Sequence, residues 1–360
     1  MKTKVLALLL LLCACFSLGT HAQEAAEGET EQAAVSETET EAKHGSAVNF
    51  ERSLDSYVPQ KNHYNFYFTY KIVHPWWDAV ALGIEEAQRQ LLERGITVTY
   101  EYMAPEMTSA KDQERRLREA AAGGDYDVIG ADVADEALIT PVLDELSEEG
   151  NKVMTFSSSD AADGCRRIAY VGNTHNYEDG AQLTEALCEK LDYRGKVAIL
   201  IGAEGAPCHE ERARGVRDTI AKYDDMKIVD VSYDQDSIEN AYQLTKEFLD
   251  RFDDLAGIVC CNMSNPVGAA RAVKEAEADV VIVGMDHDRE ALEDLRDGVI
   301  YCLGVQDCFS IGFDTIQVAV KIADGQLPGE LFPEKTQEVT TLIYQDDAEE
   351  MLANLYGVVQ

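Results

Sequence analysis

The stretch that decides the fold runs from residue 65 to residue 87. It reads Asn65-Phe-Tyr-Phe-Thr-Tyr70, then His74-Pro75-Trp76-Trp77, then Asp78-Ala-Val-Ala-Leu-Gly-Ile-Glu-Glu-Ala87. The first run is typical of a strand and the last of a helix, so both tryptophans of the chain lie at one strand-to-helix corner. In an open α/β sheet, ligands bind at this corner. The two rings could form a binding platform or simply fill a core.

Beyond this corner, the chain alternates short apolar runs with amphipathic runs of helical length, a rhythm that predicts βαβ units and parallel sheets. Strands are expected at 65–70, 97–102, 126–131, 152–157, 167–172, 196–202, 227–233, 256–262, 279–286, 299–305 and 339–344. Helices are expected near 77–94, 109–122, 135–149, 177–192, 208–223, 237–252, 264–276, 288–297, 309–325 and 346–355. A chain of 360 residues has room for two such lobes.

The rhythm breaks at three places, which predicts a hinge of three crossings between two doubly wound lobes. The breaks are the helix-free loop 157–164, the point after Gln306, and the segment 325–333. We therefore expect an α/β fold with a ligand cleft between the lobes. The predicted N-terminal lobe comprises residues 61–160 and 307–333, and the predicted C-terminal lobe comprises residues 161–306 and 334–360.

The first residues indicate export. Lys2 and Lys4 precede an apolar run, which predicts a signal peptide over residues 1–22. Leu12-Cys-Ala-Cys15 resembles a lipobox, in which Cys15 would be lipidated, and Thr20-His-Ala22 offers an alternative cleavage site. Residues 24–41 contain seven Glu and no Lys or Arg, so residues 23–60 are expected to be a disordered acidic tether. The protein is thus expected in the cell envelope, lipid-anchored or periplasmic.

Charge and composition narrow the possible partners. The net charge of −36 and the lack of a basic cluster argue against nucleic acid. No GxGxxG or P-loop follows a strand, no HExxH occurs, and no GxSxG marks a nucleophile. Cys208-His-Glu210 is not expected to hold a metal, because adjacent helical residues point in different directions. We therefore expect no cofactor, no metal and no enzymatic activity.

Several motifs occur in an order that resembles type 1 periplasmic binding proteins, in the branch that includes ribose- and galactose-binding proteins of ABC transporters. The resemblance covers roughly residues 62–345. It rests on His74-Pro-Trp-Trp77, Val171-Gly172, Asn176-Tyr-Glu-Asp-Gly180, Gly195-Lys-Val-Ala-Ile-Leu-Ile201, Glu210-Glu-Arg-Ala-Arg-Gly215, Asn262, Val283-Gly-Met-Asp286 and Val305-Gln306. Each motif is weak alone, whereas their common order and spacing are specific.

The resemblance implies a ligand site between the lobes. Trp76 and Trp77 match the two rings that sandwich a sugar, and the other implied contacts are polar: His74, Arg212, Asn262, Asp286 and Gln306. Arg212 would donate to two oxygens and Asp286 would accept from two hydroxyls. Two plainer interpretations remain open, namely that Arg212 lies on a solvated helix face and that Asp286 caps the next helix.

The first lobe departs from the ribose-binding pattern. Ser157 and Ser158 stand where that pattern has an Asp-Arg pair, so the charged clamp is expected to be missing there. The two serines, with Tyr70 and His175, could replace it with weaker contacts. The ligand could then be a sugar in a different pose, a larger saccharide or a molecule that is not a sugar.

The resemblance implies a non-enzymatic solute receptor, expected to be monomeric, that binds a small polar ligand, a carbohydrate above all, and delivers it to an ABC transporter permease. A ligand-sensing subunit for a sensor kinase or chemoreceptor would have the same fold. The effector domain of a lactose-repressor-type regulator would need a helix-turn-helix where this chain has a signal and an acidic stretch.

Overall fold

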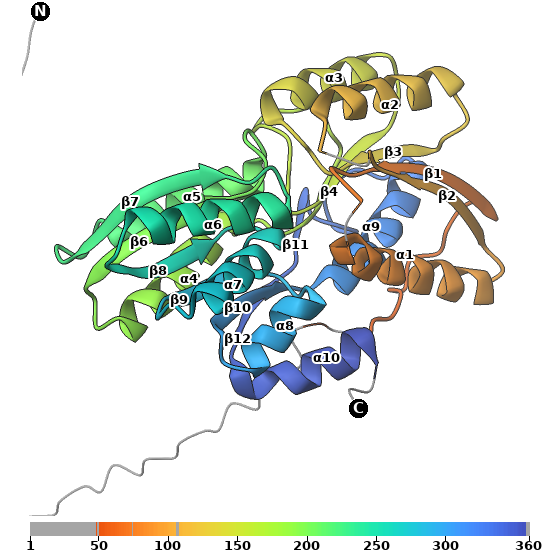
Figure 1. The fold of residues 1–360 in the computed structure, drawn as a ribbon. Helices are drawn as coiled ribbons and strands as arrows, with labels where there is room; N and C mark the ends of the chain where they lie inside the picture. Colours follow the sequence, from red (N-terminus) through yellow and green to blue (C-terminus); the bar gives the residue numbers. More distant parts are fainter. Residues whose placement is uncertain (1–47, 49, 74, 106–107, 358–360) are drawn as a thin grey trace, which may run out of the picture. The chain divides into compact units, whose positions relative to one another are not determined.

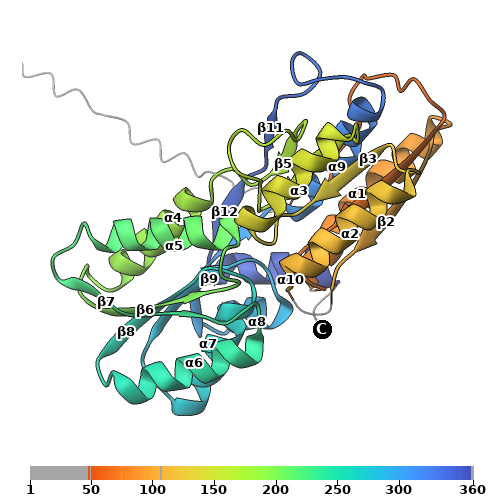
Figure 2. The ribbon, with the colours of Figure 1, turned by 90° about the horizontal axis from the view of Figure 1, so that it is seen from above.

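The computed structural model describes residue 48 and residues 50–73, 75–105 and 108–357. These residues form two α/β lobes, each built on a six-stranded sheet (Figure 1). The view from above separates the lobes most clearly (Figure 2). The fold class expected from the sequence is therefore confirmed.

The first lobe has helices α2 and α3 on one face of its sheet and α1 and α9 on the other (Figure 1). Its elements are β1 (His63–Thr69), α1 (Pro75–Glu93), β2 (Thr97–Met103), α2 (Ala110–Gly123), β3 (Val128–Ala131), α3 (Glu136–Glu148), β4 (Val153–Ser157), β5 (Tyr170–Gly172), α9 (Cys308–Ala323) and β11 (Lys335–Gln337). The strand order is β11-β5-β4-β3-β1-β2, and all of these strands pair in parallel. The carboxyl ends of β1, β3 and β4 therefore lie at one edge of the sheet.

The second lobe repeats this plan. Its elements are α4 (Asn176–Lys190), β6 (Gly195–Ile201), α5 (Pro207–Ile220), β7 (Met226–Tyr233), α6 (Ile238–Arg251), β8 (Leu255–Cys260), α7 (Ser264–Ala276), β9 (Val281–Met285), α8 (Arg289–Arg296), β10 (Ile300–Gln306), β12 (Thr340–Ile343), the short 3₁₀ helix η1 (Gln345–Asp347) and α10 (Ala348–Tyr356). The strand order is β12-β10-β9-β8-β6-β7, and only the β10–β12 pair is antiparallel among the described pairs. The sequence placed these helices and strands within a few residues of their observed bounds.

Two of the three crossings between the lobes lie at other residues than predicted. β5 pairs with β4, so the first crossing follows Gly172 instead of lying near residue 160. β11 pairs with β5, so the third crossing follows Gln337 instead of residue 333. The second crossing lies at Asp307, between β10 and α9. The crossings lie side by side, because the N–H of Glu338 donates to Gly172 O at 2.9 Å and that of Asp307 to Val339 O at 3.1 Å.

The segment before β1 also differs from the prediction, which assigned residues 23–60 to a disordered tether. Residues 50–62 lie along α1 and α9. Phe50 packs against Phe309 with ring centroids 5.2 Å apart, and Arg52 pairs with Asp314 of α9 and, at 3.0 Å, with Glu338. These contacts join a polar segment to distant parts of the chain, so its own composition does not reveal them. Apart from Val48, the rest of the predicted signal and tether lies outside the described residues.

Two pairs of glycines allow helices to approach closely. A Cβ added at Gly215 of α5 would lie 2.1 Å from Tyr177 O of α4, and one at Gly180 of α4 would lie 2.1 Å from Arg212 O. Gly83 and Gly312 serve the α1–α9 contact in the same way. Any side chain at these positions would push the helices apart. The α4–α5 contact therefore fixes the main chain that carries Arg212.

Within the described residues, no helix combines the length and apolar character needed to cross a membrane.

Candidate ligand site between the lobes

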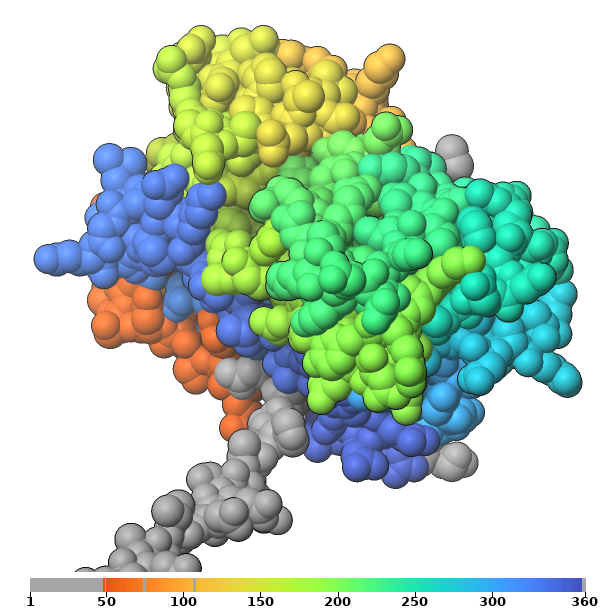
Figure 3. Space-filling model, turned by 90° about the vertical axis from the view of Figure 1, so that its left-hand side faces the viewer, coloured from red at the N-terminus to blue at the C-terminus, as the bar shows by residue number. Residues whose placement is uncertain are grey.

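A cavity lies between the lobes at the carboxyl ends of their strands. Its lining comes from Lys71, Ile72, Trp76, Trp77 and Ser158 of the first lobe and His209, Arg212, Asp236, Asn262, Met263, Ser264, Asp286 and Gln306 of the second. The space that the centre of a water-sized sphere can reach is about 50 Å³, several times what a single water molecule needs. On the face drawn in Figure 3, the green part of the second lobe lies against the yellow part of the first. A ligand in this cavity would therefore contact side chains of both lobes.

The two tryptophans form a corner of the cavity rather than a sandwich. Their ring centroids are 4.6 Å apart and the ring planes meet at 79°, so a sugar ring cannot fit between them. Trp77 also packs against Tyr70, at a centroid distance of 4.5 Å. Both tryptophans are buried and both line the cavity. The sequence left open whether the tryptophans fill a core or form a binding surface. In the structure, both residues do both.

Asp286 joins the first lobe to the second at the end of β9. Trp76 Nε1 donates to its Oδ1 at 3.0 Å, and Gln306 Nε2 donates to the same oxygen at 2.6 Å. Asp286 has a positive φ of 71°, a conformation that is costly for a side chain other than glycine and that clusters at functional sites. The N-cap of α8 is Asp288, not Asp286. The capping alternative for Asp286 is therefore wrong.

Arg212 is buried, so the alternative of a solvated helix face is also wrong. Only 2% of the residue is exposed, and its Nη1 donates to Cys261 O at 3.1 Å. Its Nε and Nη2 have no hydrogen-bond partner among the described residues, although Arg212 lines the cavity. Leaving two donors of a buried guanidinium unpaired is costly. Two acceptor atoms of a ligand would remove that cost.

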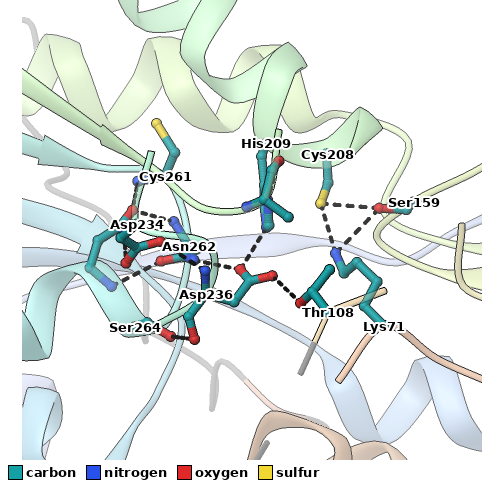
Figure 4. Close-up of polar contacts among 12 residues, drawn as sticks. Lys71, Thr108, Ser159, Cys208, His209, Asp234, Asp236, Cys261, Asn262 and Ser264 are labelled. Carbon is teal, nitrogen blue, oxygen red and sulfur yellow. Dashed lines mark hydrogen bonds and ion pairs between the residues drawn. The ribbon is translucent and has the colours of Figure 1, made fainter. Parts of the chain in front are cut away.

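Asp236 is held at the end of β7 by contacts from both lobes (Figure 4). Its carboxylate accepts from Asn262 Nδ2 at 2.7 Å and from Thr108 Oγ1 of the first lobe at 2.9 Å, and His209 Nε2 lies 3.7 Å away. Burial would raise the pKa of Asp236, but His209 and Lys71 outweigh burial and lower it. Gly202 gives this cluster room, because a Cβ there would lie 2.4 Å from Asn262 Nδ2.

The first lobe does contribute charge, contrary to the expectation that serines and rings would act alone. Lys71, two residues after β1, is buried, and its Nζ lies 3.9 Å from Asp132 Oδ2. Burial would lower the pKa of Lys71, but Asp132, Cys208 and Asp236 outweigh it and raise the pKa. Asp132 is fully buried, and among the described residues neither of its oxygens has a hydrogen-bond partner. Burial raises its pKa to about 6, although Lys71 opposes the shift.

Three residues expected in the site do not line the cavity. Tyr70 packs between Trp77 and Tyr102, at centroid distances of 4.5 and 4.3 Å, and so supports the corner from behind. Ser157 is fully buried at the end of β4 with a positive φ of 83°. His175 is the N-cap residue of α4 and pairs with Glu178 at 3.7 Å. Two other expected residues, His74 and the lipidation candidate Cys15, lie outside the described residues.

The structure brings together seven of the expected residues and adds six that sequence reasoning missed. The seven are Trp76, Trp77, Ser158, Arg212, Asn262, Asp286 and Gln306, and the six are Lys71, Ile72, His209, Asp236, Met263 and Ser264. All six lie just after a strand or near the start of a helix, so the rule that sites form at the carboxyl ends of strands could have found them. In the described ranges, no three His, Cys, Asp or Glu side chains are grouped so as to hold a metal ion.

Comparisons with known proteins agree with this arrangement. The family model of the periplasmic binding protein domain matches residues 66–327. The xylitol-binding protein of Mycolicibacterium smegmatis is 27% identical over 42% of this chain, and the chain spans only 43% of that relative. The ribose import binding protein RbsB of Bacillus subtilis is 22% identical, over 71% of this chain and 79% of its own length.

Among solved structures, the glucose-galactose binding protein GanP from Geobacillus stearothermophilus is similar, with a TM-score of 0.72 and 25% identity. The match covers 80% of this chain and 99% of GanP. The family model covers well over half of this chain, and the described fold has the two lobes of these structures. The chain therefore belongs to the family of the periplasmic binding protein domain.

Proposed function

We propose that this protein is the extracytoplasmic solute-binding component of an ABC transporter and that it binds a sugar or sugar-like polyol between its lobes without transforming it. The observation that carries this proposal is the composition of the cavity wall. Two tryptophan rings from one lobe face a buried arginine and two carboxylates from the other. The ligands named for the relatives, among them xylitol and ribose, are of the same chemical class.

The polar groups around the cavity offer donors and acceptors in balance. Arg212 supplies unpaired donors, and Asp236 and Asp286 supply carboxylate oxygens. A hydroxyl group both donates and accepts, so a polyol can satisfy both kinds of partner at once. The apolar face of a sugar ring would lie against an indole ring. A purely apolar ligand would leave the buried charges without partners, at a large cost.

The hinge supports binding by lobe closure. Asn173 lies at the first crossing, and its Nδ2 contacts Gln306 Oε1 of the second crossing and Thr340 Oγ1 of the third, both at 3.2 Å. Gln306 in turn donates to Asp286 in the cavity. A ligand that contacts both lobes stabilises the closed arrangement only by the contacts it does not make in the open one.

A thermal-shift screen of the exported protein tests this proposal. The library should contain pentoses, hexoses, their polyols, cyclitols such as myo-inositol, and nucleosides and amino acids as non-carbohydrate members. A bound ligand raises the melting temperature by mass action. At a free ligand concentration of 100 times the Kd, the folded protein gains about 2.7 kcal/mol of stability. Stabilisation by a non-carbohydrate alone, or by no library member, would contradict the proposed ligand class.

The site assignment needs a matched pair of variants on helix α5. Arg212→Gln should weaken binding of the ligand found in the screen at least tenfold, because two charge-assisted hydrogen bonds are lost. Arg214→Gln is the control, because Arg214 is exposed and pairs with Glu211. Equal affinity for the two variants, measured by isothermal titration, would place the ligand elsewhere. Circular dichroism should first show that both variants are folded.

We also propose that the protein is exported and anchored through a lipid on Cys15, as the lipobox-like Leu12-Cys-Ala-Cys15 suggests. In cells fed a labelled fatty acid, the wild-type protein should incorporate the label and Cys15→Ser should not. Equal labelling of Cys13→Ser and the wild type would support Cys15 as the acceptor. Labelling of the Cys15→Ser protein would contradict the assignment.

A further inference from the structure

The thiol of Cys208 lies at the contact between the lobes, beside the cavity. Cys208 is the second residue of α5 in the second lobe and is fully buried. Its sulfur accepts from Lys71 Nζ at 3.2 Å and from Ser159 Oγ at 3.1 Å (Figure 4). Lys71 and Ser159 both belong to the first lobe, where they follow β1 and β4. The sulfur therefore bridges the lobes as the acceptor of two hydrogen bonds.

The surroundings of this sulfur favour the thiolate. Cys208 lies in the first turn of α5, and the positive groups that act on its sulfur are His209, Lys71 and Arg212. The nearest buried acid facing Lys71 is Asp132. Burial would raise the pKa of Cys208, but the charges of His209, Lys71 and Arg212 outweigh burial and hold the pKa well below its usual range.

The other cysteines in the described ranges show the opposite behaviour. Burial raises the pKa of Cys165 and Cys188 to about 11 and that of Cys261 and Cys302 to about 12. The pKa values of Cys260 and Cys308 are also raised by burial. All seven thiols of the described ranges are free. Cys208 therefore differs from the other six in its expected chemistry as well as in its place between the lobes.

We propose that Cys208 is a modification site: when the lobes separate, its thiolate reacts with a hydroperoxide, and the oxidised side chain then hinders the lobes from closing. The sulfur attacks one peroxide oxygen, an S–O bond forms and the O–O bond breaks. Sulfur loses two electrons and becomes a sulfenic acid, while the peroxide is reduced and leaves as hydroxide or alkoxide, which takes a proton from water.

Closure should be hindered for two physical reasons. The sulfur is fully buried with donors at 3.1 and 3.2 Å, so the added oxygen has to occupy space that Lys71 and Ser159 fill in the closed arrangement. A protonated sulfenic acid also lacks the negative charge that accepts from the Lys71 ammonium. Oxidation thus removes a charge-assisted contact and adds volume at the same point.

The pH dependence of the reaction distinguishes this site from an ordinary buried thiol. The reaction occurs when the lobes are apart. Because the thiolate protein opens with a fixed equilibrium constant, the amount of open thiolate is proportional to the amount of closed thiolate. The rate therefore titrates with the pKa of the closed protein. An ordinary thiol of pKa about 8.5 loses about 75-fold in rate between pH 8 and pH 6, whereas Cys208 should lose less than tenfold.

The first experiment measures alkylation of the full exported chain by iodoacetamide at pH 6 to 8, with peptide mapping by mass spectrometry. Cys208 should react with the shallow pH profile given above, and Lys71→Gln should steepen that profile. Lys196→Gln, which removes an exposed lysine paired with Asp254, is the control and should leave it unchanged. A Cys208 profile as steep as that of an ordinary thiol, or one insensitive to Lys71→Gln, would overturn the proposal.

The second experiment treats the protein with hydrogen peroxide and traps sulfenic acid with dimedone. The adduct should map to Cys208, and the radius of gyration from small-angle scattering should increase in the wild type but not in Cys208→Ser. Trapping at Cys208 without any change of dimensions would overturn the effect on closure. Neither experiment needs a ligand, so their failure is distinguishable from failure of the proposed transport function.

Discussion

The ionisation of a single residue, Asp132, makes the stability of the protein depend on pH. It is fully buried beside Lys71, and burial raises its pKa to about 6. An acid with a higher pKa in the folded chain than in the unfolded chain takes up protons on folding. The stability it contributes is therefore fully present below about pH 4 and is lost as the pH rises to about 6.

Asp132→Asn should remove this pH dependence. The melting temperature of the variant, relative to wild type, should be higher at pH 7 than at pH 4, because only the wild type loses stability as Asp132 ionises. Differential scanning calorimetry in a pH series measures this difference. Asp253→Asn, which removes an exposed carboxylate, serves as the control. A difference for Asp132→Asn that does not change with pH would show that the pKa of Asp132 is the same in the folded and the unfolded chain.

Trp76→Phe separates the polar contact of Trp76 from its packing. The phenyl ring keeps most of the apolar contact but cannot donate to Asp286 Oδ1, as the indole does at 3.0 Å. The loss of a hydrogen bond to a charged group costs about 1.5–3 kcal/mol, which should appear in urea unfolding. Trp77→Phe makes the same exchange of rings at a residue that does not form this bond, so it should lower the free energy of unfolding less. Equal losses would assign the effect to ring size instead.

At the scale of single residues, the sequence identified those site residues whose type and position both indicate a site. Arg212, Asn262, Asp286 and Gln306 follow the family order, and all four line the cavity. Lys71 and Asp236 were missed because a single charged residue after a strand is also common on a solvated surface. The angle between the two tryptophan rings depends on packing against Tyr70 and Phe156, which no local pattern encodes.

At the scale of elements, the contact between α4 and α5 determines where Arg212 lies. Gly215→Ala should destabilise the protein by about 1–3 kcal/mol and also weaken ligand binding, because the added Cβ would lie 2.1 Å from Tyr177 O. Gly123→Ala, at the end of α2, has no atom within 4 Å of the added Cβ and is the control. Chemical denaturation measures both. If Gly215→Ala unfolds at the same urea concentration as the control, the helices do not approach as described.

The elements were predictable where hydrophobic period and length agreed. The buried runs of β3, β4 and β8 stand out in the sequence, and so do the long helices. β11 was missed because its three residues, Lys335–Gln337, are polar and partly exposed. Among the described strands it pairs only with β5, at the edge of the sheet. A strand of this kind is defined by its partner and not by its own composition.

At the scale of the whole molecule, direct contacts between the lobes set how easily the cleft opens. Thr108→Val removes the hydrogen bond from the first lobe to Asp236 at 2.9 Å while keeping the side-chain shape. The closed arrangement should become less populated, so ligand affinity should fall in proportion and the radius of gyration should rise. Thr99→Val, at an exposed residue of β2, is the control. Unchanged scattering and affinity would show that Thr108 plays no part in closure.

The leading segment has a mechanical consequence. Arg52 holds Asp314 of α9 and Glu338 of the third crossing at once. Its main-chain oxygen also accepts from Gln90 Nε2 of α1 at 2.8 Å. A force applied to the chain ahead of Arg52 would therefore reach two helices of the first lobe and the third crossing at the same residue.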